Sequence, residues 1–243
     1  METKDRIIIP VDTDNIDTAL KTVETLQPYV GMFKFGLELQ NSIISQLVNY
    51  GDLSFLEKVK RLFSLVDGKL FWDGKWDDIP NTVKGAASAI SLLKPAMVNV
   101  HVSAGQESIK TAIENSPDSL VLGVTVLTSI SSEECYWIFG EYFGYKVNYF
   151  AKILIELGAD GIICSPQELP ILNKSDFGHK LLRVVPGIRP SWAPANDQKR
   201  ITTPRQALDA GADYLVIGRP ITSPPNGMTP PEAVEKIIKE LEE

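Results

Sequence analysis

The chain has 243 residues, of which 44% are hydrophobic and 23% are charged. This balance is typical of a folded globular protein and excludes disordered, collagen-like and disulfide-stapled chains. The formal net charge of −7 argues against a general surface for nucleic acids or anionic membranes. No apolar run is long enough to cross a bilayer, and the first residues lack the basic-then-apolar pattern of a secretory signal. We therefore expect a cytoplasmic protein that binds neither nucleic acid nor membrane.

The cysteine content points the same way. Cys135 and Cys164 lack the C-x-x-C spacing of a structural zinc site, and only two histidines accompany them. Two reduced thiols in a cytoplasmic protein are the better interpretation, and no metal site is expected.

Short apolar segments with the character of strands buried on both faces recur along the chain. They comprise residues 6–11, 31–35, 69–72, 97–101, 120–126, 161–164, 181–185 and 214–217. Helix-like stretches lie between them, among them 146–157, 232–241 and the charge-rich 55–66, which we interpret as a solvated helix face. Ser103, Thr203 and Thr229 each begin a capping-box pattern, which predicts a helix start.

Eight strands alternating with helices over 243 residues suit an α/β fold of the (β/α)8 TIM-barrel type, with residues 1–243 as a single domain. A doubly wound open sheet is the alternative, although no G-x-G-x-x-G motif follows the first strand. Two connections are long, the aromatic-rich 129–144 and 189–201, and long connections in compact domains are often lids or binding loops.

Polar residues stand at the ends of the predicted strands, where a TIM barrel carries its active site. In chain order they are Asp12, Lys34, Asp73, Lys75, Asp78, His101, Thr128, Arg189, Gly218 and Arg219. Any one of them is weak support, because loops are polar in general. In a closed barrel, however, all of them would border a common mouth.

The sharpest local feature is the pattern Asp73-x-Lys75-x-x-Asp78. Residues two apart in an extended segment share a face, so Asp73 and Lys75 can point into the same space. Flanking carboxylates hold a buried lysine in its charged form, which makes Lys75 a candidate proton donor. The motif alone fits equally well a loop salt bridge, with Asp77 or Asp78 capping a helix that starts at Pro80.

A phosphate site is predicted in the loops after the seventh and eighth strands, the usual anion site of this architecture. These loops hold Gly187, Arg189, Gln198, Gly218 and Arg219. Glycine lets backbone N–H groups approach an anion closely, and arginine adds a bidentate charged clamp. The alternative is a tight turn at Gly218 followed by a surface arginine.

Six blocks resemble, in the same order, the signature of the orotidine 5′-phosphate decarboxylase family. They are DGKWDDIPNTV (73–83), VNVH (98–101), VTVLTS (124–129), PGIR (186–189), ANDQ (195–198) and IGRPIT (217–222). Asp12 and Lys34 are single matches upstream. The resemblance implies a TIM-barrel carboxy-lyase that needs no cofactor and converts orotidine 5′-monophosphate to UMP in de novo pyrimidine biosynthesis.

The resemblance also implies roles for individual residues. Lys75 matches the family's proton donor to C6, and Asp73, Asp78 and Lys34 match the rest of its charged network. Matches to substrate-binding positions are Asp12 and Lys34 for the ribose, Thr128 for the pyrimidine edge, and Arg189, Gln198, Gly218 and Arg219 for the phosphate. Pro186 is a further match among the substrate-binding residues. Asp78, Ile79 and Thr82 match positions that enter the partner subunit's site, which implies a homodimer with shared sites.

The sequence departs from the common family pattern at Trp76 and Asp77, where Phe-His is frequent, and at Pro10 and Val11, where Ala-Leu is frequent. Asp77 adds a carboxylate near Lys75. Three other interpretations compete: a Mg²⁺-dependent sugar-phosphate lyase on the same barrel, a Schiff-base aldolase, and a non-catalytic phosphate-binding sensor. Carboxylates on both sides of Lys75 disfavour the aldolase, because they keep the amine protonated and non-nucleophilic.

Overall fold

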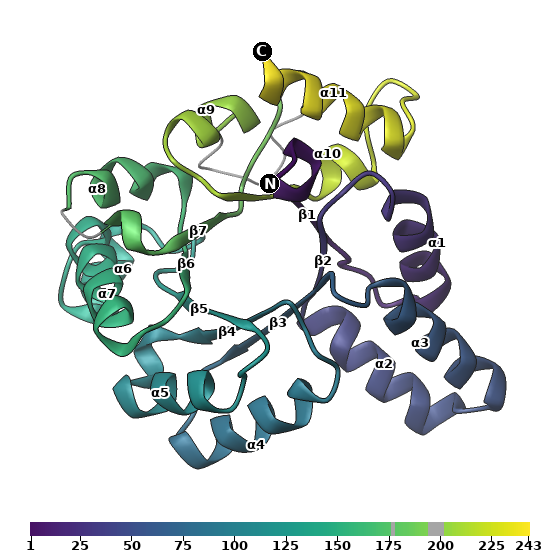
Figure 1. Cartoon of the computed structure of the whole chain (residues 1–243), viewed down its shortest axis with the longest axis horizontal. Helices are drawn as coiled ribbons and strands as arrows, with labels where there is room; N and C mark the ends of the chain where they lie inside the picture. Colours follow the sequence, from purple (N-terminus) through teal and green to yellow (C-terminus); the bar gives the residue numbers. More distant parts are fainter. Residues whose placement is uncertain (176–177, 194–201) are drawn as a thin grey trace.

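Eight parallel strands close into a barrel in the computed structural model, with helices around the outside (Figure 1). The structure describes residues 1–175, 178–193 and 202–243. The strands are β1 (Ile7–Pro10), β2 (Met32–Phe35), β3 (Leu70–Trp76), β4 (Met97–His101), β5 (Leu120–Val124), β6 (Gly161–Ile163), β7 (Leu182–Val185) and β8 (Tyr214–Val216). They follow one another around the barrel in chain order, and β8 pairs with β1 in parallel. The predicted TIM barrel is therefore confirmed, and the open sheet is wrong.

Helices and short 3-10 turns connect the strands. The helices are α1 (Ile16–Leu26), α2 (Leu37–Tyr50), α3 (Leu53–Leu65), α4 (Pro80–Ser91), α5 (Gln106–Glu114), α6 (Ser132–Phe139), α7 (Phe143–Leu157), α8 (Leu169–Asn173), α9 (Pro204–Asp209), α10 (Arg219–Thr222) and α11 (Pro230–Glu242). The 3-10 turns are η1 (Thr3–Arg6), η2 (Val102–Ala104), η3 (Pro166–Glu168) and η4 (Gly178–Lys180). Within the described part of the chain, no helix is both long and apolar enough to span a membrane.

Two of the three predicted capping boxes are confirmed. The hydroxyls of Thr203 and Thr229 accept hydrogen bonds from backbone N–H groups in the first turns of α9 and α11. The prediction at Ser103 is wrong, because α5 begins only at Gln106, behind Gly105 in the N-cap position. The Ser103 hydroxyl instead lies 3.3 Å from a carboxylate oxygen of Asp77.

The start of α4 contradicts one interpretation of the Asp-x-Lys-x-x-Asp pattern, in which Asp77 or Asp78 caps this helix. Ile79 occupies the N-cap position and Pro80 the first turn, so neither Asp77 nor Asp78 caps this helix. The acidic residues before Pro80 are therefore not explained as helix caps.

The connection expected over 129–144 is instead largely helical. It contains α6, whose capping box is formed by Ser131 and Glu134, and it runs into the start of α7. Only Cys135 of α6 is buried, so the apolar spacing that reveals a helix is weak here. Trp137 on α6 is mostly exposed.

The solvated face predicted over 55–66 is confirmed as part of α3, in which only Leu62 is buried. Lys58 and Arg61 of this helix pair with Asp17 and Glu24 of α1.

The barrel interior is filled by a cluster of apolar side chains from alternate positions of the strands. Its buried members are Ile8, Phe71, Met97, Leu122 and Val184, with partly buried neighbours such as Met32 and Val216. Successive side chains of a strand point to opposite faces, so the residue two positions further along points inward again. That next layer lies at the carboxyl end of the barrel, where polar side chains replace apolar ones.

Candidate active site

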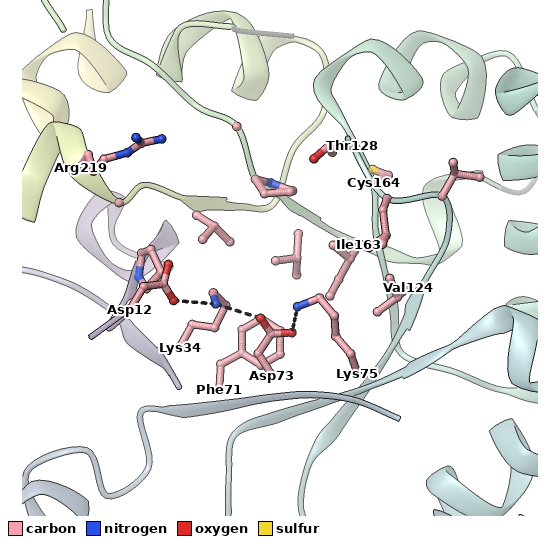
Figure 2. Close-up of a pocket in the computed structure, with 18 of the residues that line it drawn as sticks. Asp12, Lys34, Phe71, Asp73, Lys75, Val124, Thr128, Ile163, Cys164 and Arg219 are labelled. Carbon is pink, nitrogen blue, oxygen red and sulfur yellow. Dashed lines mark hydrogen bonds and ion pairs between the residues drawn. The ribbon is translucent and has the colours of Figure 1, made fainter. Parts of the chain in front are cut away.

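A cavity of about 320 Å³ opens at the carboxyl end of the barrel (Figure 2). Most of the predicted site residues line it: Asp12, Lys34, Asp73, Lys75, Thr128, Pro186, Arg189, Gly218 and Arg219. Its apolar wall includes Phe71, Val124, Ile163 and Val216. Lys34 follows Met32 by two residues, Asp73 follows Phe71, and Gly218 follows Val216, so the strand period places all three above the interior layer. The barrel therefore brings the polar strand ends to a common mouth.

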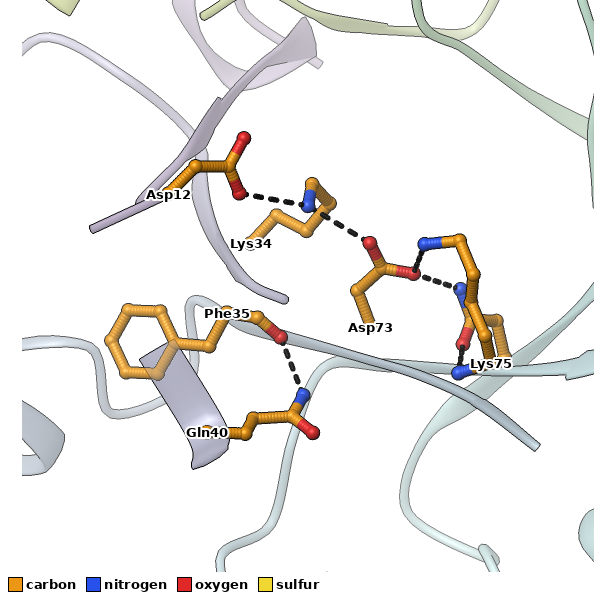
Figure 3. A network of polar contacts seen from close by, with 7 residues as sticks. Asp12, Lys34, Phe35, Gln40, Asp73 and Lys75 are labelled. Carbon is orange, nitrogen blue, oxygen red and sulfur yellow. Dashed lines mark hydrogen bonds and ion pairs between the residues drawn. The ribbon is translucent and has the colours of Figure 1, made fainter. Parts of the chain in front are cut away.

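Four charged side chains form a chain of alternating sign across this mouth (Figure 3). Lys34 Nζ lies 3.5 Å from Asp12 Oδ1 and 2.8 Å from Asp73 Oδ2. Lys75 Nζ lies 2.6 Å from the other oxygen, Asp73 Oδ1. Asp73 thus holds one ammonium group on each carboxylate oxygen, and both lysines reach the cavity from neighbouring strands.

Burial and the neighbouring charges together determine the protonation of Asp73 and Lys34. Burial by itself would raise the pKa of Asp73, but the positive charges of Lys34 and Lys75 outweigh it and lower the pKa to about 2. Burial would likewise lower the pKa of Lys34, but the charges of Asp73 and Asp12 outweigh it and raise the pKa above its ordinary value. At neutral pH Asp73 is therefore an ionised carboxylate, and Lys34 beside it is a cationic amine.

Lys75 reaches the cavity through an irregularity of β3. The strand does not end at Asp73 as expected but continues to Trp76. Trp72 pairs with Val98 and Trp76 with Val100, so the strand bulges between these pairs. Lys75 has φ of 45°, the left-handed region, which costs a residue with a side chain roughly 1–3 kcal/mol. Such strain concentrates at functional sites.

Asn99 is a site residue to which the sequence analysis assigned no role. It lies in β4, is fully buried, and its Nδ2 donates a hydrogen bond of 2.6 Å to Asp73 Oδ1. Its Oδ1 accepts a hydrogen bond of 2.7 Å from the backbone N–H of Lys75. The available signal was its spacing, two residues after the interior residue Met97.

Three predicted site residues lie outside the cavity of this single chain. Asp78, Ile79 and Thr82 are all exposed, in the segment that follows β3. Asp78 Oδ1 accepts a hydrogen bond from the backbone N–H of Ile79 at 2.7 Å. Among the described residues, Asp73 is the carboxylate that pairs with Lys75, so Asp78 does not complete the network within one chain.

The predicted phosphate residues occupy the far side of the mouth. Figure 2 shows Arg219 on the opposite side of the cavity from Lys75. Arg189 follows β7, is buried, and its backbone N–H donates to Thr202 O at 2.9 Å. Gln198 and most of the 189–201 connection lie outside the described residues, so the structure places neither.

Asp77 and His101 stand beside the charged chain rather than within it. Asp77 is exposed and lies within hydrogen-bonding distance of Ser103. Burial lowers the pKa of His101, against a smaller raising effect of the Asp77 charge. No cluster of three or more His, Cys, Asp or Glu side chains suited to a metal ion occurs within 1–175, 178–193 and 202–243.

Cys135 and Cys164 are both buried, and neither forms a disulfide. Cys164 lines the cavity, and burial raises the pKa of its thiol well above the ordinary value, so it is neutral there.

Comparison with known proteins decides the family. Residues 5–237 match the family described as Orotidine 5′-phosphate decarboxylase / HUMPS. The chain belongs to this family. It is 40% identical to the orotidine 5′-phosphate decarboxylase of Syntrophomonas wolfei subsp. wolfei, in an alignment covering 100% of both sequences. It is 39% identical to the orotidine 5′-phosphate decarboxylase of Gloeothece citriformis, over 98% of each.

Solved structures agree with the family assignment. The orotidine 5′-phosphate decarboxylase from Lactobacillus acidophilus matches with a TM-score of 0.76 at 30% identity, covering 98% of this chain and 99% of that one. The orotidine 5′-phosphate decarboxylase from Pyrococcus horikoshii OT3, at 22% identity and a TM-score of 0.72, shares the fold. The resemblance seen in the six sequence blocks is therefore confirmed at the level of the orotidine 5′-phosphate decarboxylase / HUMPS family.

Proposed function

We propose that this chain is a carboxy-lyase that decarboxylates orotidine 5′-monophosphate to UMP without a cofactor. One observation carries the proposal: the Lys75 ammonium lies 2.6 Å from Asp73 inside a cavity that Arg219 borders on its other side. A proton donor and a cationic phosphate anchor therefore face each other across one hollow. A nucleotide with a carboxylate on its base could place that carboxylate near Lys75 and its phosphate near Arg219.

The substrate would lie across the mouth with its phosphate at Arg189, Gly218 and Arg219. Guanidinium groups bind phosphate through charge-assisted, often bidentate hydrogen bonds. Gln198 belongs to the same proposed phosphate site. Binding energy from the phosphate, which does not react, would hold the base in place.

The middle of the substrate would contact the remaining lining residues. The ribose hydroxyls would lie near Asp12 and Lys34, whose side chains already pair at 3.5 Å. The pyrimidine edge would meet Thr128, with Pro186 packing nearby. In this proposed order along the cavity, C6 of the base would lie beside the Asp73 and Lys75 pair.

The chemical step would then proceed by direct loss of carbon dioxide. The bond between C6 and the carboxylate breaks, CO₂ leaves, and the electron pair stays on C6, where the ring offers no conjugated acceptor. Lys75, oriented by Asp73, stabilises this developing charge and transfers its proton to C6, giving UMP. The neutral amine then regains a proton from water, so no other reactant is consumed.

We further propose a homodimer in which Asp78, Ile79 and Thr82 enter the partner's cavity. These residues are exposed in the single chain although they directly follow β3. Leu37, Ile44 and Val48 form an apolar stripe on α2, each more than half exposed, as is Ile79. Leu37 and Ile79 follow the neighbouring strands β2 and β3, so apolar surface lies at the rim of the mouth, as an interface requires.

The same proposal places the reaction in de novo pyrimidine biosynthesis, whose product would be UMP. We expect it to occur in the cytoplasm, in keeping with two cysteines that form no disulfide.

Purified protein tests the proposal directly. Its addition to orotidine 5′-monophosphate in the presence of EDTA should abolish the substrate's absorbance and yield UMP and CO₂. Activity that disappears with EDTA and returns with Mg²⁺, or turnover of sugar phosphates alone, would indicate the Mg²⁺-dependent lyase instead. Tight UMP binding without any turnover would indicate the phosphate-binding sensor.

A further inference from the structure

Asn99 links the two residues on which the proposed chemistry depends. Its amide donates to Asp73 Oδ1 at 2.6 Å and accepts from the Lys75 backbone N–H at 2.7 Å. A backbone N–H can only donate and an ionised carboxylate can only accept, so these partners determine which end of the amide is oxygen. The side chain is fully buried, which makes both hydrogen bonds expensive to lose.

The position of Asn99 opposite the β3 bulge explains why it is used in this way. Between the pairs Trp72–Val98 and Trp76–Val100, β3 places Asp73, Gly74 and Lys75 against the single residue Asn99. The Lys75 N–H is therefore out of register with a backbone acceptor on β4. The Asn99 side chain takes the place of that acceptor, and Lys75 keeps its left-handed conformation with φ of 45°.

The two hydrogen bonds act on different parts of the pair. The bond to the Lys75 N–H fixes the backbone from which the ammonium enters the cavity. The bond to Asp73 Oδ1 fixes the carboxylate on the same oxygen that accepts from Lys75 Nζ. One amide therefore sets both the origin of the lysine side chain and the direction of its counter-ion.

We propose that Asn99 is a positioning residue for the decarboxylation, holding the strained Lys75 backbone and the Asp73 carboxylate in register. This inference rests on the proposed function, because it assigns Asn99 to the proton-transfer step of that reaction. Asn99 itself does not line the cavity, so it acts through Lys75 and Asp73 rather than on the substrate.

Replacement by leucine, of similar size, removes both hydrogen bonds. A misplacement of a reacting group by about 1 Å costs roughly 100-fold in rate, so we expect Asn99→Leu to lower kcat by about that factor. The proposed phosphate and ribose contacts come from other strands. The affinity for UMP, measured by calorimetry, should therefore stay within about threefold of the wild-type value.

Replacement by aspartate separates positioning from packing. Asp at this position keeps an acceptor for the Lys75 N–H, but its second oxygen meets Asp73 Oδ1 and repels it unless protonated. Two carboxylates that share a site raise the pKa of one of them. We therefore expect the kcat of Asn99→Asp, relative to wild type at the same pH, to rise as the pH falls from about 8 to about 5. A loss of packing alone would give a constant ratio.

Asn173 offers a matched control, because its amide also bridges two partners. It accepts from Arg183 and donates to Ala210 O at 2.9 Å, and it does not line the catalytic cavity. Asn173→Leu should leave both kcat and UMP affinity near wild-type values, even if it lowers the melting temperature.

The outcomes separate this inference from the proposed function. Loss of kcat with retained UMP affinity in Asn99→Leu, together with the pH-dependent ratio in Asn99→Asp, supports it. Wild-type kcat in Asn99→Leu, or a constant ratio in Asn99→Asp, overturns it while the proposed function stands. If the wild-type protein itself does not turn over, the proposed function fails. A crystal structure of Asn99→Asp at about pH 8, where the new carboxyl is expected to repel Asp73, then decides whether Lys75 and Asp73 keep their positions, and unchanged positions overturn the inference.

Discussion

Asp73 is the residue around which the charged side chains of the mouth are arranged. Its two oxygens pair separately with Lys34 and Lys75, while Asn99 donates to the oxygen shared with Lys75. A buried carboxylate with this many donors stays ionised, which is the condition for holding a proton-bearing amine next to it. The arrangement gives the mouth a fixed dipolar pattern before any ligand enters, and preorganised charge is the usual main source of catalysis.

The low pKa of Asp73 has a consequence for stability with a definite sign. With a pKa of about 2 in the folded chain and 3.8 as the reference value, the ionised form stabilises the fold fully above pH 4. That contribution, about 2 kcal/mol, is lost as the pH falls through 2. We expect the difference in unfolding free energy between wild type and Asp73→Asn to shrink by this amount between pH 5 and pH 2.

Urea unfolding at a series of pH values measures that difference. Asp17, which pairs with Lys58 on the surface, provides the comparison, since exposed pairs contribute little. Asp17→Asn should differ from wild type by at most a few tenths of a kcal/mol at every pH. A wild-type advantage over Asp73→Asn that stayed constant or grew toward pH 2 would contradict the proposed ionisation.

Arg219 carries the next prediction, which concerns binding rather than chemistry. Its guanidinium would clamp the phosphate, and a charge-assisted hydrogen bond of this kind contributes about 1.5–3 kcal/mol. Arg219→Ala should therefore weaken UMP binding by about 10- to 100-fold in a calorimetric titration. Arg61→Ala, which removes a surface arginine paired with Glu24, should bind UMP as the wild type does. Equal affinities in the two variants would refute the phosphate role of Arg219.

Individual residues show how far sequence reasoning reaches. Asp12, Lys34, Asp73, Lys75 and Arg219 could be assigned to one mouth because each stands at or just after the carboxyl end of a predicted strand, and these strand ends meet at one end of a barrel. Asn99 was missed because its spacing, two residues after Met97, does not indicate what its amide binds. Its role depends on a bulge in the neighbouring strand, which follows from the register between β3 and β4 and not from a local pattern.

At the scale of elements, β3 and α6 are the two cases in which the spacing of apolar residues did not predict the structure correctly. The expected end of β3 at Asp73 followed from the loss of apolar character, yet the strand pairs as far as Trp76. The helix α6 was taken for part of a connection because only Cys135 of its eight residues is buried. Where burial is sparse, the pattern of apolar residues carries little information about the backbone.

The helix starts at Thr203 and Thr229, by contrast, depend on local contacts and could be predicted. Thr229 and Glu232 satisfy each other's backbone N–H groups at the start of α11, the helix that covers the barrel near the chain's first strand. Removal of an N-cap hydroxyl costs roughly 1 kcal/mol, so Thr229→Ala should lower the unfolding free energy by about that amount. Urea denaturation measures it.

Thr22 is the matched control for that variant. It lies inside α1, where its hydroxyl donates to Thr18 O at 2.9 Å and caps nothing. Thr22→Ala should leave stability unchanged or slightly higher, because alanine is the better residue in a helix interior. If Thr229→Ala proved as stable as Thr22→Ala, the capping box would not stabilise α11.

At the scale of the whole molecule, barrel closure is what assembles the site, and the proposed homodimer is what completes it. Lys75 lines the cavity of its own chain, whereas Asp78 is exposed after β3. If each site takes Lys75 from one subunit and Asp78 from the other, Lys75→Ala and Asp78→Asn subunits complement each other. Random mixing of the two inactive variants should then restore about a quarter of the wild-type activity, through one intact site in each mixed dimer.

A second mixture controls for that result. Lys75→Ala and Asp73→Asn damage the same chain's half of the site, so their mixture should stay inactive. Recovery of activity in this control would contradict the shared site. So would a lack of recovery in the first mixture when native mass spectrometry shows that mixed dimers have formed.

The central claim is that Lys75 donates the proton that replaces CO₂. The most direct measurement compares wild type with Lys75→Ala for UMP formation from orotidine 5′-monophosphate in EDTA, with UMP affinity determined on the same preparations. We predict that the variant loses at least about 1,000-fold in kcat, since it loses both charge stabilisation and the proton source. It should still bind UMP measurably through the proposed phosphate contacts of Arg189, Gly218 and Arg219. Turnover by Lys75→Ala at a rate near that of the wild type would contradict the account.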